Sequence, residues 1–256
     1  MEIRIEDLTK DFEDGTRALN GIDLLIEDGM FGLLGMNASG KSTLMNILAT
    51  LEKPSGGKVT VDGLDLARDR AKVRAMTGYL PQRFSEFTHI TVWEFLDYTA
   101  RLSGIRKKLK RHDAIDEMLD SLGLTPYRSR PANELSPVMK RHLEIAQAMI
   151  GSPRLLIIDE PTVGLSPGER LRFRKLLAEK TKSIEIIIMS THILGDITSA
   201  CSDMAILDAG GIVFRGAPED LLVKAGKNDV IENSSQDMLD NEKTAAAVIS
   251  YFTNTH

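Results

Sequence analysis

The sequence lacks the features of a membrane-spanning or disulfide-stabilised chain. Its 256 residues contain one cysteine, Cys201, which excludes a disulfide within the chain and fits a reducing compartment. We expect Cys201 to be a small buried residue rather than a reactive thiol. The longest aliphatic runs, such as LLII and IIIM, are far shorter than the roughly 20 residues that cross a bilayer. The charged start, MEIRIEDLTKDF, does not resemble a signal peptide, so any membrane role is expected to be peripheral.

Aromatic residues are scarce at 5%, and no strong excess of positive charge is present, because the net charge is −5. Surfaces that bind nucleic acid are usually basic, so we expect no nucleic acid as the main partner. The apolar fraction of 42% and the charged fraction of 27% are typical of a soluble protein. The length fits one large domain, or a core with an added lobe.

What the sequence does contain is a phosphate-binding loop, GMNASGKST, at residues 35–43. It fits the pattern G-x-x-x-x-G-K-[ST], in which backbone N–H groups, a lysine and a hydroxyl meet phosphates and Mg²⁺. The apolar run at 30–34 predicts a buried strand before the loop, and 42–51 predicts a helix after it. This setting favours a nucleotide site over a glycine-rich loop with a surface lysine. The candidate binding residues are Gly35, Asn37, Ala38, Ser39, Gly40, Lys41, Ser42 and Thr43. The helix is expected to bury Leu44, Ile47, Leu48 and Leu51 on one face.

Polar residues follow three other apolar runs. The run 154–159 ends in Asp159 and Glu160, 76–82 ends in Gln82, and His192 follows 184–190. Ligands bind at the carboxyl edge of an open parallel sheet, where such strand ends meet. Asp159 is therefore a candidate for Mg²⁺, and Glu160 for a general base or water-positioning group. Each residue taken singly also has an ordinary structural explanation. The two acids fit a loop that follows a strand, Gln82 fits a solvated surface side chain, and His192 fits a histidine with a structural role.

The remaining pattern divides the chain into a β portion, a helical lobe and a core. Residues 1–8 predict an edge strand, and 21–26 and 58–61 predict further strands of a small antiparallel sheet. Residues 83–150 are predicted to be a helical lobe, with a helix that Ser136 caps and Pro137 begins. Its basic cluster KKLKR, residues 107–111, fits a solvated face, with lipid headgroups or a partner as the alternative.

The rest of the core is predicted from the same signals. Helices are expected at 167–180, 218–224 and 244–252, and a hairpin joins strands at 204–207 and 212–214. After residue 226 the chain becomes polar up to the last of these helices.

Taken together, these stretches resemble the nucleotide-binding subunit of ABC transporters over about residues 1–225. The resemblance matches Gln82 to the Q-loop, residues 135–139 to the signature, Asp159 and Glu160 to Walker B and the catalytic glutamate, His192 to the switch histidine, and Phe12 to the adenine-stacking ring. It implies an α/β fold: a P-loop NTPase core with a mostly parallel sheet, an N-terminal antiparallel β subdomain and an inserted helical subdomain at about 83–150. Residues 226–256 would be a polar C-terminal extension.

The resemblance also implies a function. The chain would bind and hydrolyse ATP with Mg²⁺, using Ser42, Gln82 and Asp159 for the metal and Glu160, His192 and Gln82 for catalysis. Its partners would be an integral membrane permease, docked near residues 83–95, and a second nucleotide-binding subunit. It would lie on the cytoplasmic face of the cell membrane as a peripheral protein. The amino-acid sequence of several stretches is most similar to that of the corresponding subunits of bacterial exporters.

Two motifs depart from the family pattern. The signature reads LSPVM, so Pro137 and Val138 replace two glycines, while Ser136 keeps the hydroxyl that would meet the γ-phosphate of the second subunit. Ser166 replaces an aspartate in the loop after Walker B. We expect a homodimer to turn over slowly and a heterodimer with an intact partner to keep one good site. Alternatives are a soluble ABC-type ATP switch, or a nucleotide sensor with weak hydrolysis.

Overall fold

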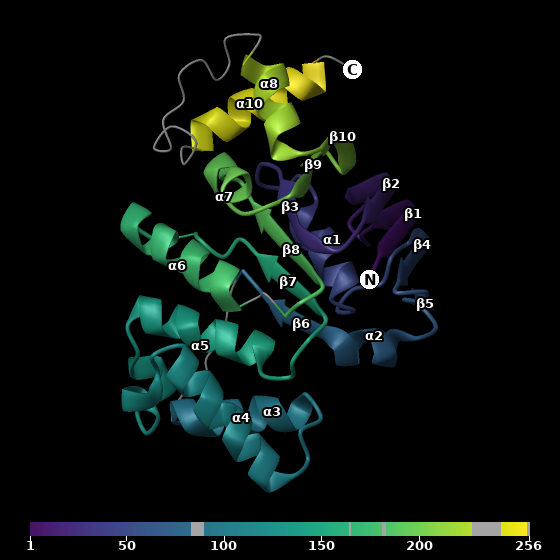
Figure 1. Cartoon of the computed structure of the whole chain (residues 1–256). Helices are drawn as coiled ribbons and strands as arrows, with labels where there is room; N and C mark the ends of the chain where they lie inside the picture. Colours follow the sequence, from purple (N-terminus) through teal and green to yellow (C-terminus); the bar gives the residue numbers. More distant parts are fainter. Residues whose placement is uncertain (83–89, 164, 181–182, 227–241, 255–256) are drawn as a thin grey trace.

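The first of two β-sheets is antiparallel and contains the N-terminal strands. The computed structural model describes residues 1–82, 90–163, 165–180, 183–226 and 242–254 (Figure 1). The strands of this sheet lie in the order β2 (Arg17–Ile26), β1 (Ile3–Asp11), β4 (Gly56–Val61) and β5 (Leu64–Asp65). The small antiparallel sheet is therefore confirmed.

The prediction that residues 1–8 form an edge strand is wrong. β1 pairs on both sides, because Ile3 lies opposite Ile26 of β2 and also opposite Val61 of β4. Alternating polar and apolar residues indicate a strand with one buried face. That pattern is the same for an edge strand and a central strand, so it could not decide between them.

The second sheet forms the core and is mostly parallel, as predicted. Its strand order is β10-β9-β3-β8-β7-β6, and among the described strands of this sheet only β9 and β10 pair antiparallel. The strands are β3 (Gly29–Leu34), β6 (Thr77–Leu80), β7 (Leu155–Asp159), β8 (Ile186–Thr191), β9 (Asp203–Asp208) and β10 (Gly211–Gly216). The carboxyl ends of β3, β6, β7 and β8 therefore lie along one edge of the sheet.

Helix α1 (Lys41–Leu48) follows the phosphate loop and is shorter than predicted. Leu44, Ile47 and Leu48 are buried as expected, but Leu51 lies beyond the helix and is 59% exposed. The chain turns at Thr50, whose φ is +63°.

The end of α1 is held by a helix that the sequence did not predict, α2 (Arg70–Met76). Arg70 Nε donates to the carbonyl oxygen of Thr50 at 3.0 Å, and Arg74 Nε donates to Thr50 Oγ1 at 2.8 Å. Cations at the carboxyl end of a helix are favourable, because they meet its unpaired carbonyl groups.

The helical lobe contains α3 (Val92–Leu102), α4 (Lys108–Ser121) and α5 (Pro137–Met149), at the lower end of Figure 1. Ser136 caps α5 by accepting a hydrogen bond from the Met139 N–H at 3.3 Å, as predicted. The basic cluster is only partly solvated. Arg111 is buried, and its Nε lies 2.5 Å from Asp97 Oδ1, which joins α4 to α3. Residues 83–89 of the predicted lobe lie outside the described residues.

The C-terminal helices complete the core. Helices α6 (Pro167–Lys180), α8 (Pro218–Gly226) and α10 (Glu242–Asn254) confirm three predictions, and a short α7 (Leu194–Thr198) follows β8. The description of residues 226–256 as polar is wrong for α10. Four of its side chains are buried, and the Phe252 ring lies 4.9 Å from that of Phe214 in β10. The buried side chains are Ala245, Val248, Ile249 and Phe252.

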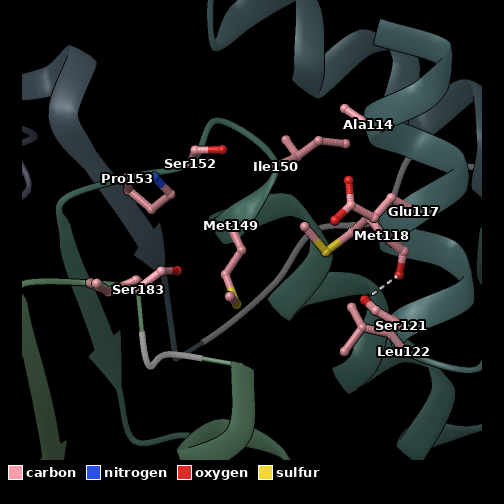
Figure 2. A pocket seen from close by; sticks show the side chains of 11 residues that line it. Ala114, Glu117, Met118, Ser121, Leu122, Met149, Ile150, Ser152, Pro153 and Ser183 are labelled. Carbon is pink, nitrogen blue, oxygen red and sulfur yellow. Dashed lines mark hydrogen bonds between the residues drawn. The ribbon is translucent and has the colours of Figure 1, made fainter. Parts of the chain in front are cut away.

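A cavity of about 480 Å³ lies between α4 of the lobe and the segments before β7 and β8. Figure 2 shows Glu117, Met118 and Ser121 of α4 on one side of it and Met149 and Pro153 on the other. It opens at the amino ends of the parallel strands, opposite the predicted site.

Within the described residues, no helix combines the length and the apolar character needed to span a bilayer.

Candidate nucleotide site

A pocket of about 350 Å³ lies where the phosphate loop meets the carboxyl edge of the parallel sheet. Of the predicted site residues, it is lined by Phe12, Asn37, Ala38, Ser39, Gly40, Lys41, Ser42, Thr43, Gln82 and Glu160. Thr16, Arg17 and Ala18 also line it, although the sequence did not single them out. They lie where β2 begins, the Thr16 carbonyl oxygen accepts the Phe12 N–H at 2.9 Å, and no motif in the sequence indicated them.

The phosphate loop has the tight backbone that its glycines predict. Gly40 has a φ of +106°, and a Cβ there would lie 2.5 Å from the carbonyl oxygen of Ala18. A Cβ at Gly35 would lie 2.4 Å from Ser39 Oγ. Ser39 Oγ itself is buried without a hydrogen-bond partner among the described residues. A loop this close-packed, with a spare buried hydroxyl and the N-terminus of α1 beside it, fits an anionic phosphate.

Lys41 is buried beneath the loop, 4% exposed. Its Nζ donates to the carbonyl oxygens of Gly35 at 2.7 Å and Met36 at 3.0 Å. The same atom lies 3.4 Å from Glu160 Oε1. Burial lowers the pKa of Lys41 from its ordinary value, and the carboxylates of Glu160 and Asp159 oppose that shift. The ammonium group is thus fixed at the point where the loop meets the acidic strand end.

The Glu160 carboxylate lies between three predicted residues. Gln82 Nε2 donates to Glu160 Oε2 at 2.8 Å, and His192 Nδ1 lies 3.5 Å from the same oxygen. Lys41 lies against the other oxygen. The pKa of Glu160 is lowered by hydrogen bonding with His192; burial opposes this shift, and Lys41 adds to it. The buried side chain is therefore kept as a carboxylate, the form that can accept a proton.

Asp159 is buried at the end of β7 and is oriented by Ser190, which the sequence did not single out. Ser190 Oγ donates to Asp159 Oδ1 and accepts the Glu160 N–H at 3.0 Å. Asp159, Ser42 and Gln82 can all supply oxygen atoms, which are the ligands that Mg²⁺ prefers. Among the described residues, no three His, Cys, Asp or Glu side chains form a metal site by themselves. These three residues therefore fit a cation that also takes phosphate and water oxygens.

Arg141 of α5 is another residue that sequence reasoning missed. It is buried, and its Nε donates to the carbonyl oxygen of Pro161 at 2.8 Å, while Nη2 donates to that of Glu160 at 3.1 Å. Glu160 has a φ of +47°, which is unusual for a residue with a side chain. Arg141 thus ties α5 to the strained backbone of the acidic loop. An arginine on a helix with one apolar face gave no sign of being buried.

Behind the site, Asp196 of α7 joins both loops that carry the polar residues. Its side chain is fully buried and accepts hydrogen bonds from Thr162 Oγ1 at 2.5 Å and Thr191 Oγ1 at 3.1 Å. Thr162 follows Glu160 by two residues, and Thr191 directly precedes His192. The negative charge of Asp196 is balanced by Arg174 of α6, whose Nε donates to Asp196 Oδ1 at 2.8 Å.

Two predicted residues stand apart from this cluster. The Phe12 ring is 39% exposed at the rim of the pocket, with Lys10 Nζ 4.9 Å from its centroid. Ser136 is exposed at the start of α5 and does not line the pocket. One chain therefore brings together the phosphate loop, Gln82, Glu160 and His192, but not Ser136.

Comparisons with known proteins agree with this geometry. The family profile described as ABC transporter matches residues 19–163. ABC transporter ATP-binding protein NatA of Bacillus subtilis (strain 168) is 30% identical in an alignment of 236 residues, and the match covers 89% of this chain and 94% of that protein. Daunorubicin/doxorubicin resistance ATP-binding protein DrrA of Streptomyces peucetius is 32% identical over 84% of this chain and 65% of its own length.

Some relatives are longer, since the chain spans 35% of the probable multidrug ABC transporter ATP-binding protein YbhF of Escherichia coli (strain K12), at 33% identity. Among solved structures, cbiO1 from Clostridium perfringens, described as part of the ABC transporter complex cbiONQ, matches with a TM-score of 0.78. It is 27% identical, and the match covers 90% of this chain and 94% of that one.

Proposed function

The chain belongs to the ABC transporter family and carries its ATP-binding ATPase domain, and from this premise we propose that it powers a membrane-embedded permease by hydrolysing ATP. One observation carries the proposal: the Glu160 carboxylate lies between Lys41, Gln82 and His192 at the phosphate loop. This places a proton acceptor beside groups that bind a terminal phosphate.

The side chains divide the chemistry between them. Lys41 and the loop N–H groups bind the β- and γ-phosphates, and Phe12 stacks on the adenine ring. Glu160 orients the attacking water and accepts its proton, while His192 contacts the γ-phosphate. Ser42, Gln82 and Asp159 would hold Mg²⁺, which supplies positive charge to the phosphate oxygens when it is bound.

A Glu160→Gln variant tests the hydrolytic role. Because the amide cannot accept the proton, we expect turnover to fall about 100-fold or more while ATP binding is retained. Glu117→Gln, an exposed change on α4, is the matched control and should keep wild-type turnover. Unchanged turnover in Glu160→Gln would contradict this assignment.

The permease is proposed to dock in a groove of about 600 Å³ between α3 and the α2–β6 segment. The groove exposes Leu51 and Leu102, whose side chains are 59% and 70% exposed. We expected residues 83–95 to line it. Residues 83–89 lie outside the described part of the chain, and the described lining comes from later in α3, at Thr99 and Leu102.

Detergent pull-down of the tagged chain from its native membranes tests the partner. A polytopic membrane protein with a second nucleotide-binding subunit would support an asymmetric transporter. A membrane protein without one would show that the altered signature works in a homodimer. Recovery of soluble proteins alone would favour the ATP switch or nucleotide sensor. Export is the proposed direction, because the names of DrrA and YbhF refer to drug resistance and multidrug transport.

The altered signature and loop support slow turnover by a homodimer. Pro137 is exposed as the first residue of α5 and has no N–H to offer a nucleotide. Ser166 precedes α6 and, instead of presenting a carboxylate, donates its N–H to Glu169 Oε2 of that helix at 2.7 Å. We expect Pro137→Gly with Val138→Gly to raise the ATPase rate of the purified chain. Brisk turnover that these changes do not improve would contradict the proposal.

A further inference from the structure

A cluster of exposed cations surrounds the turn between α3 and α4. We define the basic turn patch as Arg106, Lys107, Lys108, Leu109 and Lys110, all of them exposed. Residues 101–111 contain no acidic residue, although the whole chain has a net charge of −5. None of the four cations of the patch forms an ion pair with a carboxylate of the described residues. The patch is therefore a local concentration of uncompensated positive charge.

The neighbouring arginines show that the patch is distinct from the structural charges of the lobe. Arg101 and Arg111 both pair with Asp97, at 2.8 Å and 2.5 Å, and this ion-pair cluster joins α3 to α4. Both carboxylate oxygens of Asp97 are thus already paired with these two arginines. The charges of the patch do not contribute to holding the two helices together.

Leu109 gives the patch an apolar tip. Its side chain is 78% exposed in the first turn of α4, between Lys108 and Lys110, and Leu102 at the end of α3 is 70% exposed. These are the two highest exposures among the large hydrophobic residues of the described chain. Exposed leucine flanked by lysine is typical of surfaces that enter the headgroup region of a bilayer, with the apolar group inserted and the ammonium groups at the phosphates.

The stability of α4 does not explain this arrangement. Its first turn has no acid, while Asp113, Asp116, Glu117 and Asp120 lie further along the helix. Positive charge at the amino end and negative charge towards the carboxyl end both oppose the helix dipole. A charge pattern that destabilises the helix carrying it indicates a role other than stabilising the fold.

The patch also lies beside the groove proposed for the permease. Leu102, Ser103 and Gly104 line that groove and lead directly into the patch. We propose that the basic turn patch binds anionic lipid headgroups of the bilayer that surrounds the transporter. The proposal rests on the proposed function for the orientation of this face, and on the charge and the exposed leucines for its ligand.

Vesicle co-sedimentation of the purified full chain tests the proposal. Vesicles of phosphatidylcholine alone are compared with vesicles that contain about one part phosphatidylglycerol to three of phosphatidylcholine. We expect binding to the anionic vesicles only, and its loss as salt screens the charges. Each lysine near an anionic surface strengthens binding about fivefold, so Lys107→Gln/Lys108→Gln/Lys110→Gln should weaken it about 100-fold.

A matched control separates the patch from net charge. Arg4→Gln/Lys53→Gln/Lys58→Gln removes the same number of exposed cations from around the N-terminal sheet, and should bind like wild type. Leu109→Ser should weaken binding about tenfold without changing its salt dependence. All these positions are exposed, so equal melting temperatures are expected and would confirm that the variants are folded.

Two results would overturn the proposal. In one, the wild-type chain does not bind anionic vesicles, or the patch variant and the control variant bind them equally well. In the other, the patch variant binds vesicles normally but loses the permease in detergent, which would assign the patch to an acidic segment of that protein. The vesicle measurements depend neither on ATP hydrolysis nor on co-purification of a partner, whereas the comparison in detergent uses the pull-down in which the wild-type chain recovers the permease. Failure here therefore leaves the proposed function standing, and failure of that function is seen separately.

Discussion

Asp196 and Arg174 form an ion pair beneath the nucleotide site, with Arg174 Nε 2.8 Å from Asp196 Oδ1. The second carboxylate oxygen of Asp196 accepts the hydroxyl groups of Thr162 and Thr191. These threonines belong to the two loops that carry Glu160 and His192. One buried carboxylate thus fixes the spacing of the two residues proposed to act on the terminal phosphate.

We predict that Asp196→Asn lowers kcat about tenfold or more and leaves the KM for ATP nearly unchanged. The amide keeps the size of the side chain but cannot accept from both threonines while it faces Arg174. It also leaves the Arg174 charge without its buried partner, which should cost about 3 kcal/mol in the free energy of unfolding. Steady-state ATPase kinetics and urea unfolding measure the two effects.

Asp196→Glu is the informative companion, because it restores the charge with a longer side chain. We expect it to recover most of the stability but not the full kcat. Asp113→Asn, an exposed change on α4, should alter neither value. A parallel fall in kcat and in ATP affinity for Asp196→Asn would indicate general disruption of the site instead of a positioning role.

Arg141→Gln is predicted to lower kcat about tenfold. The change removes the two hydrogen bonds that hold the carbonyl oxygens of Glu160 and Pro161, and Glu160 then relaxes from its positive φ. Arg141→Lys should not restore activity, because an ammonium group cannot match the planar guanidinium that reaches both oxygens. Lys175→Gln on α6 is the exposed control. Wild-type rates in Arg141→Lys would show that charge alone is sufficient.

Cys201 gives a prediction about pH. Burial raises the pKa of its thiol well above the ordinary value of 9.0, and Asp196 and Asp203 add to the shift. Above pH 9 the unfolded chain loses this proton while the folded chain keeps it. The free energy of unfolding should therefore fall by up to about 1.4 kcal/mol per pH unit above pH 9 from this group. Below pH 9 the contribution is fully present.

Urea unfolding at several pH values, with Cys201→Ala beside wild type, isolates that contribution. The variant should lack the extra slope above pH 9. Thiol reagents should label Cys201 in urea but scarcely in the native state. Rapid native labelling at pH 8 would contradict the buried, protonated thiol.

Phe252→Ala is predicted to destabilise the fold by about 3 to 5 kcal/mol, because it removes a buried ring that packs on Phe214. The measurement is the free energy of unfolding in urea. Val223→Ala on α8 serves as the control, since that side chain is 57% exposed and should change stability by less than about 0.5 kcal/mol. Equal effects of the two changes would show that α10 contributes no packing.

The sequence predicted the parts of the site that local pattern encodes. The phosphate loop, Gln82, Glu160 and His192 each follow an apolar strand, and parallel strands bring such ends to one edge. The same reasoning failed where partners come from distant segments. Arg141 and Ser190 bind the acidic loop, but an arginine on a helix and a serine at a strand end look ordinary in sequence.

The errors in the fold have the same origin. β1 is central because β4 pairs with it, and nothing in residues 1–8 encodes that neighbour. Leu51 continues the apolar period of α1, but the chain leaves the helix at Thr50, where arginines from α2 hold the turn. Arg111 lies in a run of exposed cations and is buried only because Asp97 of α3 faces it.

The strand order also limits when the ATP site can form during synthesis. β3, which leads into the phosphate loop, pairs with β8 and β9, and Gly29 lies opposite Ile186. The loop is thus translated early, but its strand has no neighbour in the described core sheet until about three-quarters of the chain has been made. A ribosome-bound nascent chain that ends before β8 should therefore not retain ATP, and this subunit must depend on its late strands, or on a chaperone, before it can bind nucleotide.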